Sequence, residues 1–171
     1  MRAVSEWFWV IAGIFAGLII FSIAIFKVSQ MNLSIAEQKS LESFEELKNK
    51  INNLCWSFSY NKREHILLLS ENIEGVYVFE SKKEFSSEEL KSLILNKEIS
   101  KGDFLCIKIK GKRLKCERLE CNSSMPFLGY ISESPSLSAL INKVIKGVSV
   151  SENRLLLERE EERVNITLIG K

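Results

Sequence analysis

The strongest hydrophobic pattern in the chain is an unbroken apolar run close to its start. Residues 7–26, WFWVIAGIFAGLIIFSIAIF, carry no charge. Twenty helical residues at about 1.5 Å each span roughly 30 Å, which is the thickness of the hydrocarbon layer of a bilayer. Trp7 and Trp9 lie at one end, where indole rings favour the membrane interface, and Lys27 follows the other end. The pattern predicts a transmembrane helix over residues 7–26, preceded by a short polar leader over residues 1–6.

A cleaved export signal is the alternative interpretation of this run. Ser22-Ile-Ala24 offers a small-x-small cleavage site. The apolar region of a secretory signal usually covers only about 7–15 residues and follows a basic segment. Here the run is longer, and Arg2 is the only Lys or Arg before it. We therefore expect the helix to be retained.

Small residues form a second pattern inside the apolar run. Gly13 and Gly17 make a GxxxG motif. Small residues four apart let two helix backbones approach closely in lipid, although glycine and alanine are also common in membrane helices generally. The candidate residues for helix–helix packing are Ala12, Gly13, Ala16 and Gly17. Glu6, at the bilayer margin, either stays hydrated or pairs with the α-amino group of a neighbouring chain.

The apolar run continues into an amphipathic segment. No proline or glycine interrupts residues 18–74. Apolar residues spaced by three and four draw one helical stripe: Leu41, Phe44, Leu47, Ile51, Leu54 and Phe58. Glu46 and Lys50 lie one turn apart in the favourable order. We expect a single helix over about residues 5–56, with residues 27–58 as its amphipathic extension. Two heptads are too few for a coiled coil, so this stripe should pack on the domain that follows.

Residues 59–171 have the pattern of an α+β head. Short β-rich runs predict strands over 65–70, 75–80, 148–151, 154–157 and 163–169, and a hairpin over 103–120. Ser86 and Glu89 form a capping box for a short helix over 86–95, and a second short helix covers 134–147. EREEER, residues 158–163, is expected at a solvated hairpin tip. The predicted fold is a mostly antiparallel sheet with two short helices, packed on the long N-terminal helix.

The composition narrows the function classes. Lys and Arg total 24 against 22 acidic residues, so the chain lacks the basic excess of a nucleic-acid-binding protein. His65 is the only histidine and Asp103 the only aspartate, and no glycine-rich phosphate loop is present. We expect no enzyme activity, no catalytic residues, no cofactor and no metal. His65, beside an aliphatic run, is expected to be a strand-edge residue.

Four cysteines point to the compartment of the head. An even number behind an export-type N-terminus predicts two disulfides among Cys55, Cys106, Cys116 and Cys121. Free buried thiols are one alternative, and zinc is a poor one because only one close cysteine pair exists. If the hairpin loop is residues 110–112, Cys106 lies opposite Cys116, and Cys55 then joins Cys121. A register change of one residue would break that pairing.

Disulfides favour an external head, with the N-terminus in the cytoplasm. Asn32, Asn122 and Asn165 begin N-x-S/T triplets that agree with this orientation. Asn32 lies close to the membrane, which leaves Asn122 and Asn165 as the candidate glycosylation sites. The predicted location is the cell membrane, with a single span and an extracellular head.

The whole layout resembles the archaeal type IV pilin-like proteins, which are exported with class III signal peptides. The resemblance rests on RAVSEWFWVIAG, on LKNKINNLCWSF followed by ILLLSENIEGVYVFE, and on LCIKIKGKRLKCERLEC with MPFLGY. It implies processing by a prepilin-type peptidase just before the apolar helix, and burial of that helix in a filament core. It also implies that Glu6 neutralises the terminus of an adjacent subunit. A cut after Arg2 would make Glu6 the fourth residue of the mature chain, and a cut after Met1 would make it the fifth.

Two functions remain open at this level. The first is a pilin-like cell-surface protein, a filament subunit or minor pilin, whose partners are the membrane, other pilin-like subunits and assembly proteins. The second is a single-pass anchored envelope binding domain that does not polymerise. Helix-to-helix burial of the apolar run distinguishes the first from the second.

Overall fold

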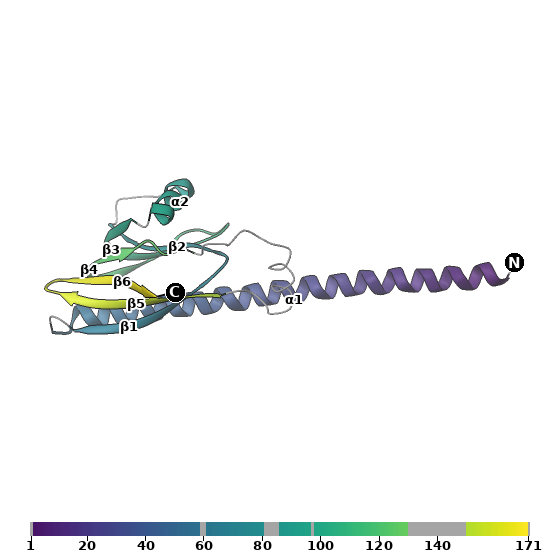
Figure 1. Cartoon of the computed structure of the whole chain (residues 1–171), viewed down its shortest axis with the longest axis horizontal. Helices are drawn as coiled ribbons and strands as arrows, with labels where there is room; N and C mark the ends of the chain where they lie inside the picture. The colour runs from purple at the N-terminus through teal and green to yellow at the C-terminus, as the bar shows by residue number, and fades with distance from the viewer. Residues whose placement is uncertain (1, 59–60, 81–85, 97, 130–149, 171) are drawn as a thin grey trace.

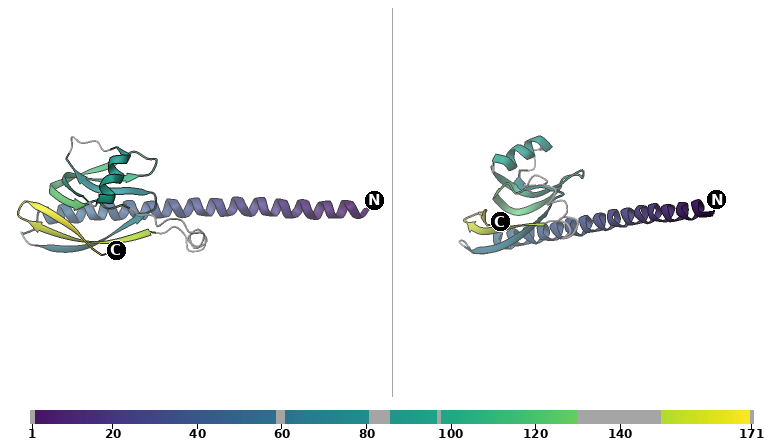
Figure 2. Two further views of the ribbon diagram at one scale, coloured as in Figure 1. Left: turned by 45° about the horizontal axis from the view of Figure 1, so that its top comes forward. Right: turned by 45° about the vertical axis from the view of Figure 1, so that its right-hand side comes forward.

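The computed structural model describes residues 2–58, 61–80, 86–96, 98–129 and 150–170. Its longest element is α1, Arg2–Cys55, an uninterrupted helix of 54 residues, which corresponds to about 81 Å. The first half of α1 extends beyond the rest of the protein, and its second half carries a β-sheet (Figure 1). Two further views show the same arrangement, with the first half of α1 extending away from the folded head (Figure 2). The predicted single long helix is confirmed.

The end of α1 corrects one sequence prediction. The Ser57 amide and hydroxyl both donate to the carbonyl of Leu54, at 3.0 and 2.8 Å, and this turn closes the helix. Phe44, Leu47, Ile51 and Leu54 of the predicted stripe are fully buried, and Leu41 packs beside them. The prediction for Phe58 was wrong: it follows the last helical residue, no longer shares the stripe, and is 94% exposed.

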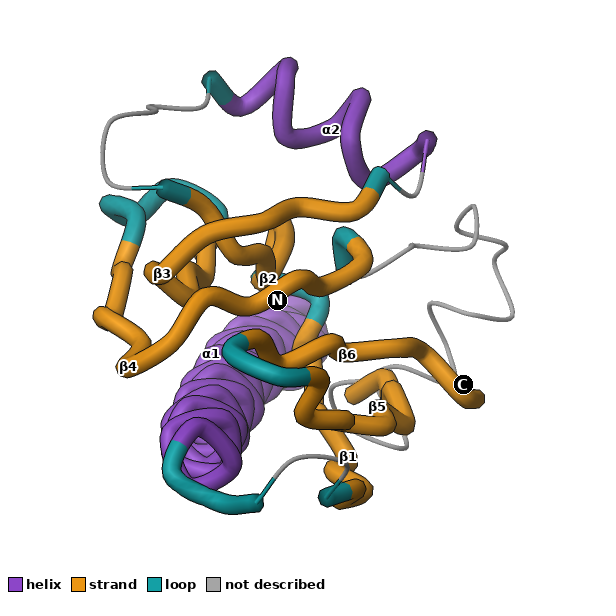
Figure 3. Tube along the Cα trace, turned by 90° about the vertical axis from the view of Figure 1, so that its left-hand side faces the viewer, coloured by secondary structure: helices purple, strands orange, loops and turns teal. Residues whose placement is uncertain are grey.

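The head contains one six-stranded sheet with the order β1-β5-β6-β4-β3-β2. The strands are β1 Lys62–Ser70, β2 Ile73–Phe79, β3 Ile99–Ile109, β4 Lys115–Pro126, β5 Val150–Glu160 and β6 Arg163–Gly170. All neighbours are antiparallel except β4 and β6, which pair in parallel over residues 122–124 and 163–165. Viewed along α1, the sheet curves around one side of the helix (Figure 3).

The strand predictions agree with the sheet except in one segment. Residues 148–151 and 154–157 were expected as separate strands, but Val150–Glu160 forms the single strand β5. The polar residues between them, Glu152 and Asn153, continue the ladder opposite Leu68 and Leu67 of β1. Polar side chains alone therefore did not end this strand. The tip of the β5–β6 hairpin lies within EREEER as expected, with Glu161 at a φ of 51°.

One short helix, α2 Ser87–Asn96, lies on the outer face of the sheet (Figure 3). Its capping box forms as predicted. The Ser86 amide donates to the Glu89 carboxylate at 2.7 Å, and the Glu89 amide donates to the Ser86 hydroxyl at 3.3 Å. The predicted second short helix, residues 134–147, lies outside the described residues.

Two apolar clusters sit on opposite faces of the sheet. The larger lies between α1 and the sheet and includes Phe44 and Leu47 from the helix with Leu105 and Ile107 from β3. Each fully buried side chain of this size contributes roughly 1.5–3 kcal/mol. The smaller lies beneath α2 and consists of Tyr77, Leu90, Cys106 and Phe127. Burial raises the pKa of Tyr77 in this cluster to about 12. The sheet and the second half of α1 therefore form one folded unit.

Candidate functional site

The apolar half of α1 is the most distinctive surface of the molecule. Within the described residues, α1 is the one helix long and apolar enough to cross a membrane. The head covers none of this segment: Trp7 is 70% exposed, Trp9 is 74% exposed, and every described side chain from residue 9 to residue 28 is exposed. In water such a surface would be strongly unfavourable, whereas a lipid or protein environment would bury it.

The small residues of this segment lie open. A Cβ added at Gly13 or Gly17 would meet no atom within 4 Å. Ala12 and Ala16 are exposed beside them. The four small residues are thus accessible to another helix, as the helix-packing hypothesis requires. The backbone of Glu6 belongs to α1, but its side chain lies outside the described residues.

The second half of α1 is joined to β4 and to the turn before it by a row of polar contacts. In order along the helix, Glu37 pairs with Lys112, Glu45 with Lys115 at 2.5 Å, Lys48 with Glu117 at 3.2 Å, and the Asn52 side chain accepts from the Glu120 amide at 3.1 Å. The hydrogen bond from Lys115 is the main reason why the pKa of Glu45 lies below its usual range. The start of β4 therefore runs alongside α1 in the same direction.

Both expected disulfides form. Cys55, the last residue of α1, joins Cys121 of β4 with Cα atoms 5.7 Å apart. Cys106 of β3 joins its direct cross-strand partner Cys116 of β4, with Cα atoms 4.1 Å apart. These are the pairs that the hairpin register favoured. The first bond fixes the end of the helix to the sheet, and the second closes the β3–β4 hairpin.

Side chains of α1 also hydrogen-bond to β1, one of the two edge strands of the sheet. β1 is an edge strand, so one row of its backbone groups lacks a strand partner. The Ser43 hydroxyl donates to the carbonyl of Ile66 at 3.2 Å and accepts from the amide of Leu68 at 3.0 Å. The Ser40 hydroxyl accepts from the amide of Ser70 at 2.9 Å. Neither serine was predicted from the sequence. Each lies one turn before a buried stripe residue, Phe44 or Leu47, and this position could have indicated that they face the sheet.

His65 is on β1, but its ring is turned into the interface with α1. The imidazole is 3% exposed, its Nε2 lies 3.2 Å from the carbonyl of Ser43, and its Nδ1 lies 3.2 Å from the Lys50 ammonium. Burial, followed by the charge of Lys50, lowers its pKa. A neutral ring that donates from Nε2 and accepts at Nδ1 satisfies both contacts. His65 is therefore a structural residue of the helix–sheet interface.

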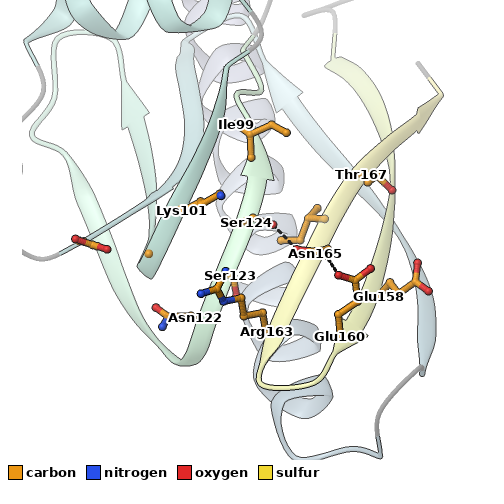
Figure 4. Close-up of a pocket in the computed structure, with 13 residues that line it drawn as sticks. Ile99, Lys101, Asn122, Ser123, Ser124, Glu158, Glu160, Arg163, Asn165 and Thr167 are labelled. Carbon is orange, nitrogen blue, oxygen red and sulfur yellow. Dashed lines mark hydrogen bonds between the residues drawn. The ribbon is translucent and has the colours of Figure 1, made fainter.

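A polar groove opens on the sheet where β4 and β6 pair in parallel (Figure 4). Its volume is about 550 Å³, and its lining includes Lys101, Glu158, Glu160, Arg163 and Thr167. At its centre, the Ser124 hydroxyl donates to Asn165 Oδ1 at 2.5 Å, and Asn165 Nδ2 donates to Glu160. The sequence did not predict this groove because it depends on the parallel β4–β6 contact.

The two candidate glycosylation residues both line this groove. Asn122 is exposed, whereas Asn165 is half-buried and uses both atoms of its amide in hydrogen bonds. In the folded chain, Asn122 is therefore the more accessible of the two. The third triplet residue, Asn32, lies on α1 close to the apolar half.

The described residues hold no group of three or more His, Cys, Asp or Glu side chains placed to bind a metal. All four cysteines are in disulfides, and the single histidine is buried against α1. The groove contains carboxylates and cations, with neither a thiol nor an imidazole among its lining residues.

No protein family matches the sequence, and no characterised protein or solved structure shows significant similarity to it.

Proposed function

We propose that this chain is a single-pass, pilin-like surface protein. Its N-terminus lies in the cytoplasm, its head stands outside the cell, and it works as a filament subunit or minor pilin through protein contacts. The observation that carries the proposal is the uninterrupted helix α1. The head covers none of the described side chains in its apolar half, and its other half packs into the core of the head.

Three further features support this proposal. The apolar half is long enough for a bilayer and can equally be buried among other helices in a filament core. The two disulfides suit an oxidising compartment. The helix continues without a break into the head, and the Cys55–Cys121 bond fixes its end to β4. A pulling force on the head is therefore transmitted directly to the apolar half of α1.

The test is assembly of a variant carrying Gly13→Leu and Gly17→Leu, measured as high-mass species after cross-linking in native membranes. The added side chains meet nothing in the single chain, so the fold should be unaffected. We expect the assemblies to be lost, because bulk at these positions separates packed helices. Ser22→Leu is the control: it lies nine residues after Gly13, on about the opposite side of the helix. Equal assembly by both variants would contradict the filament proposal.

A second candidate function rests on the polar groove. Its mixed charge and polar lining suit an anchored binding domain that recognises an envelope partner or a polar ligand. In that case α1 would serve only as an anchor, and Leu at both glycines would be tolerated. Arg163→Ala and Lys101→Ala would then reduce retention of the partner without changing the mass of the membrane species.

A further inference from the structure

The turn between β3 and β4 carries the densest positive charge in the chain. Residues 108–115, KIKGKRLK, contain five cations and no acidic residue. Within the described part of the protein, two of these cations pair with helix carboxylates, Lys112 with Glu37 and Lys115 with Glu45. Lys110 and Arg113 are exposed, and neither has a carboxylate partner among the described residues. Lys110 and Arg113 therefore carry positive charge that no ion pair of the described fold uses.

The contacts with α1 give the direction in which this turn points. Lys115 contacts the helix at Glu45, and Lys112 contacts it at Glu37. Those helix positions are eight residues apart, or about 12 Å along the axis. Proceeding from β4 into the turn therefore leads along α1 toward its apolar half. Glu37 belongs to the first part of α1 that the head covers, next to the buried Ala36.

The distance from this turn to a bilayer is within electrostatic reach. Glu37 follows Phe26, the end of the apolar run, by 11 residues, or about 16 Å of helix. Headgroups extend about 5–7 Å beyond the hydrocarbon layer on each side. The remaining gap of about 10 Å is close to the Debye length of about 8 Å at physiological salt, and helix tilts of about 20° are common.

We infer that Lys110 and Arg113 form a docking surface for the anionic headgroups of the membrane that holds α1. This inference rests on the membrane anchorage in the proposed function. The proposed orientation places the head outside the cell, so the surface in question is the outer leaflet. An outer leaflet that contains anionic lipids is complementary to the turn in sign and lies on the side toward which the turn points. The acidic groups near the turn include Glu37, which is paired with Lys112, and Glu71 in the β1–β2 turn, whose neighbour Asn72 accepts from the Lys110 amide at 2.8 Å. Glu74 of β2 also lies beside the end of β3, between the partners of Ile109 and Lys108.

Docking would set the orientation of the head. Each Lys or Arg near an anionic surface contributes about 1 kcal/mol, so two of them shift the ratio of docked to undocked heads by about 30-fold. The head would then lean toward the bilayer on the side of β3 and β4. High salt would release it, because exposed charges about a Debye length apart are screened.

The experiment uses the full chain in nanodiscs that carry a spin label on the lipid headgroups. Paramagnetic broadening of the backbone amides of residues 110–113 reports proximity to the headgroups. We expect broadening in discs with an anionic phospholipid at about 0.05 M salt, and its loss at about 0.5 M salt or in purely zwitterionic discs. Lys110→Gln with Arg113→Gln should abolish it. The control, Lys91→Gln with Arg118→Gln, removes two exposed cations of α2 and β4 and should retain it.

The outcomes separate this inference from its premise. Failure of the chain to enter the discs, judged by co-elution, would refute anchorage and docking together. Insertion with no broadening at 110–113, or with equal broadening in zwitterionic discs, would refute docking alone. If Lys110→Gln with Arg113→Gln alters assembly in membranes but leaves the broadening unchanged, the turn binds an acidic surface of another protein, and the lipid inference is overturned.

Discussion

His65 shows how one buried side chain can couple the helix–sheet interface to pH. Its pKa is lowered from the ordinary value of about 6.5, first by burial and then by the charge of Lys50. Because the folded pKa lies below the unfolded one, the folded chain binds the proton less readily. The contribution to stability is therefore fully present above pH 6.5 or so and is lost as the pH falls below that value.

The prediction is that the His65 ring titrates below about pH 6.5 in the folded protein. The chain has one histidine, so its imidazole gives a single signal in an NMR titration. As the pH falls from the unfolded to the folded pKa, the free energy of unfolding should decrease by up to about 1.4 kcal/mol per pH unit. His65→Gln should remove this part of the pH dependence. A midpoint at or above the ordinary value would contradict the burial of the ring beside the Lys50 ammonium.

Gly102 is a position where only glycine fits. Its φ is 154°, and an added Cβ would lie 2.1 Å from the carbonyl carbon and 2.3 Å from the carbonyl oxygen of Phe79. We expect Gly102→Ala to lower the free energy of unfolding by about 3 kcal/mol or more, since backbone atoms must move. Gly111→Ala is the matched control, because its φ of 71° adds strain while the space around it is empty; it should cost about 1 kcal/mol. Equal losses in denaturant unfolding would refute the clash.

At the scale of elements, the Cys55–Cys121 bond is the covalent link between α1 and the sheet. The cysteines are 66 positions apart, so by chain entropy the bond contributes about 4 kcal/mol. We expect Cys55→Ala with Cys121→Ala to lower the unfolding free energy by about that amount. Amide hydrogen exchange in the last turn of α1 should also become faster.

The cross-strand bond provides the control for this prediction. Cys106→Ala with Cys116→Ala removes a bond of sequence separation 10, which lies in the apolar cluster on the face of the sheet opposite α1. Its removal should destabilise the β3–β4 hairpin and leave exchange at the end of α1 unchanged. If the last turn of α1 exchanges equally in the protein with all four cysteines and in both variants, the helix is held by noncovalent contacts alone.

Local patterns determine most of these elements, which explains why they could be predicted. The absence of glycine and proline from residue 18 to residue 74 indicated one helix, and the stripe from Phe44 to Leu54 identified its buried face. Gly111 and the alternation of apolar residues suggested the β3–β4 register that pairs Cys106 with Cys116, and the structure has that register. The prediction for Phe58 was wrong because an apolar stripe does not indicate the residue at which the helix ends.

Features that depend on distant segments were not predictable in this way. The groove arises where residues 122–124 meet residues 163–165 in parallel, and no pattern within either strand encodes that contact. The same holds for Ser40 and Ser43, whose role depends on which strand lies against α1. A serine on a buried helical face indicates a polar partner, but it does not identify that partner.

At the scale of the whole molecule, the proposals depend on the apolar half of α1 remaining in the mature chain. Removal up to Ala24 would leave only a short apolar remnant, beginning at Ile25, in front of the head. The retained helix instead predicts a mature mass that includes Trp7 and Trp9. It also predicts an increase of about 4 Da on reduction, because two disulfides take up four hydrogens.

Intact mass spectrometry of the protein from native membranes, with and without reductant, measures both quantities at once. Any excess mass on Asn122 would show as discrete steps of sugar size, and Asn122→Gln should remove them while Asn165→Gln should not, since Asn165 is bonded to Ser124 and Glu160. A chain that begins near Ile25 would remove the basis for anchorage, assembly and lipid docking alike. A mass unchanged by reductant would instead refute the oxidising location of the head while leaving the helix in place.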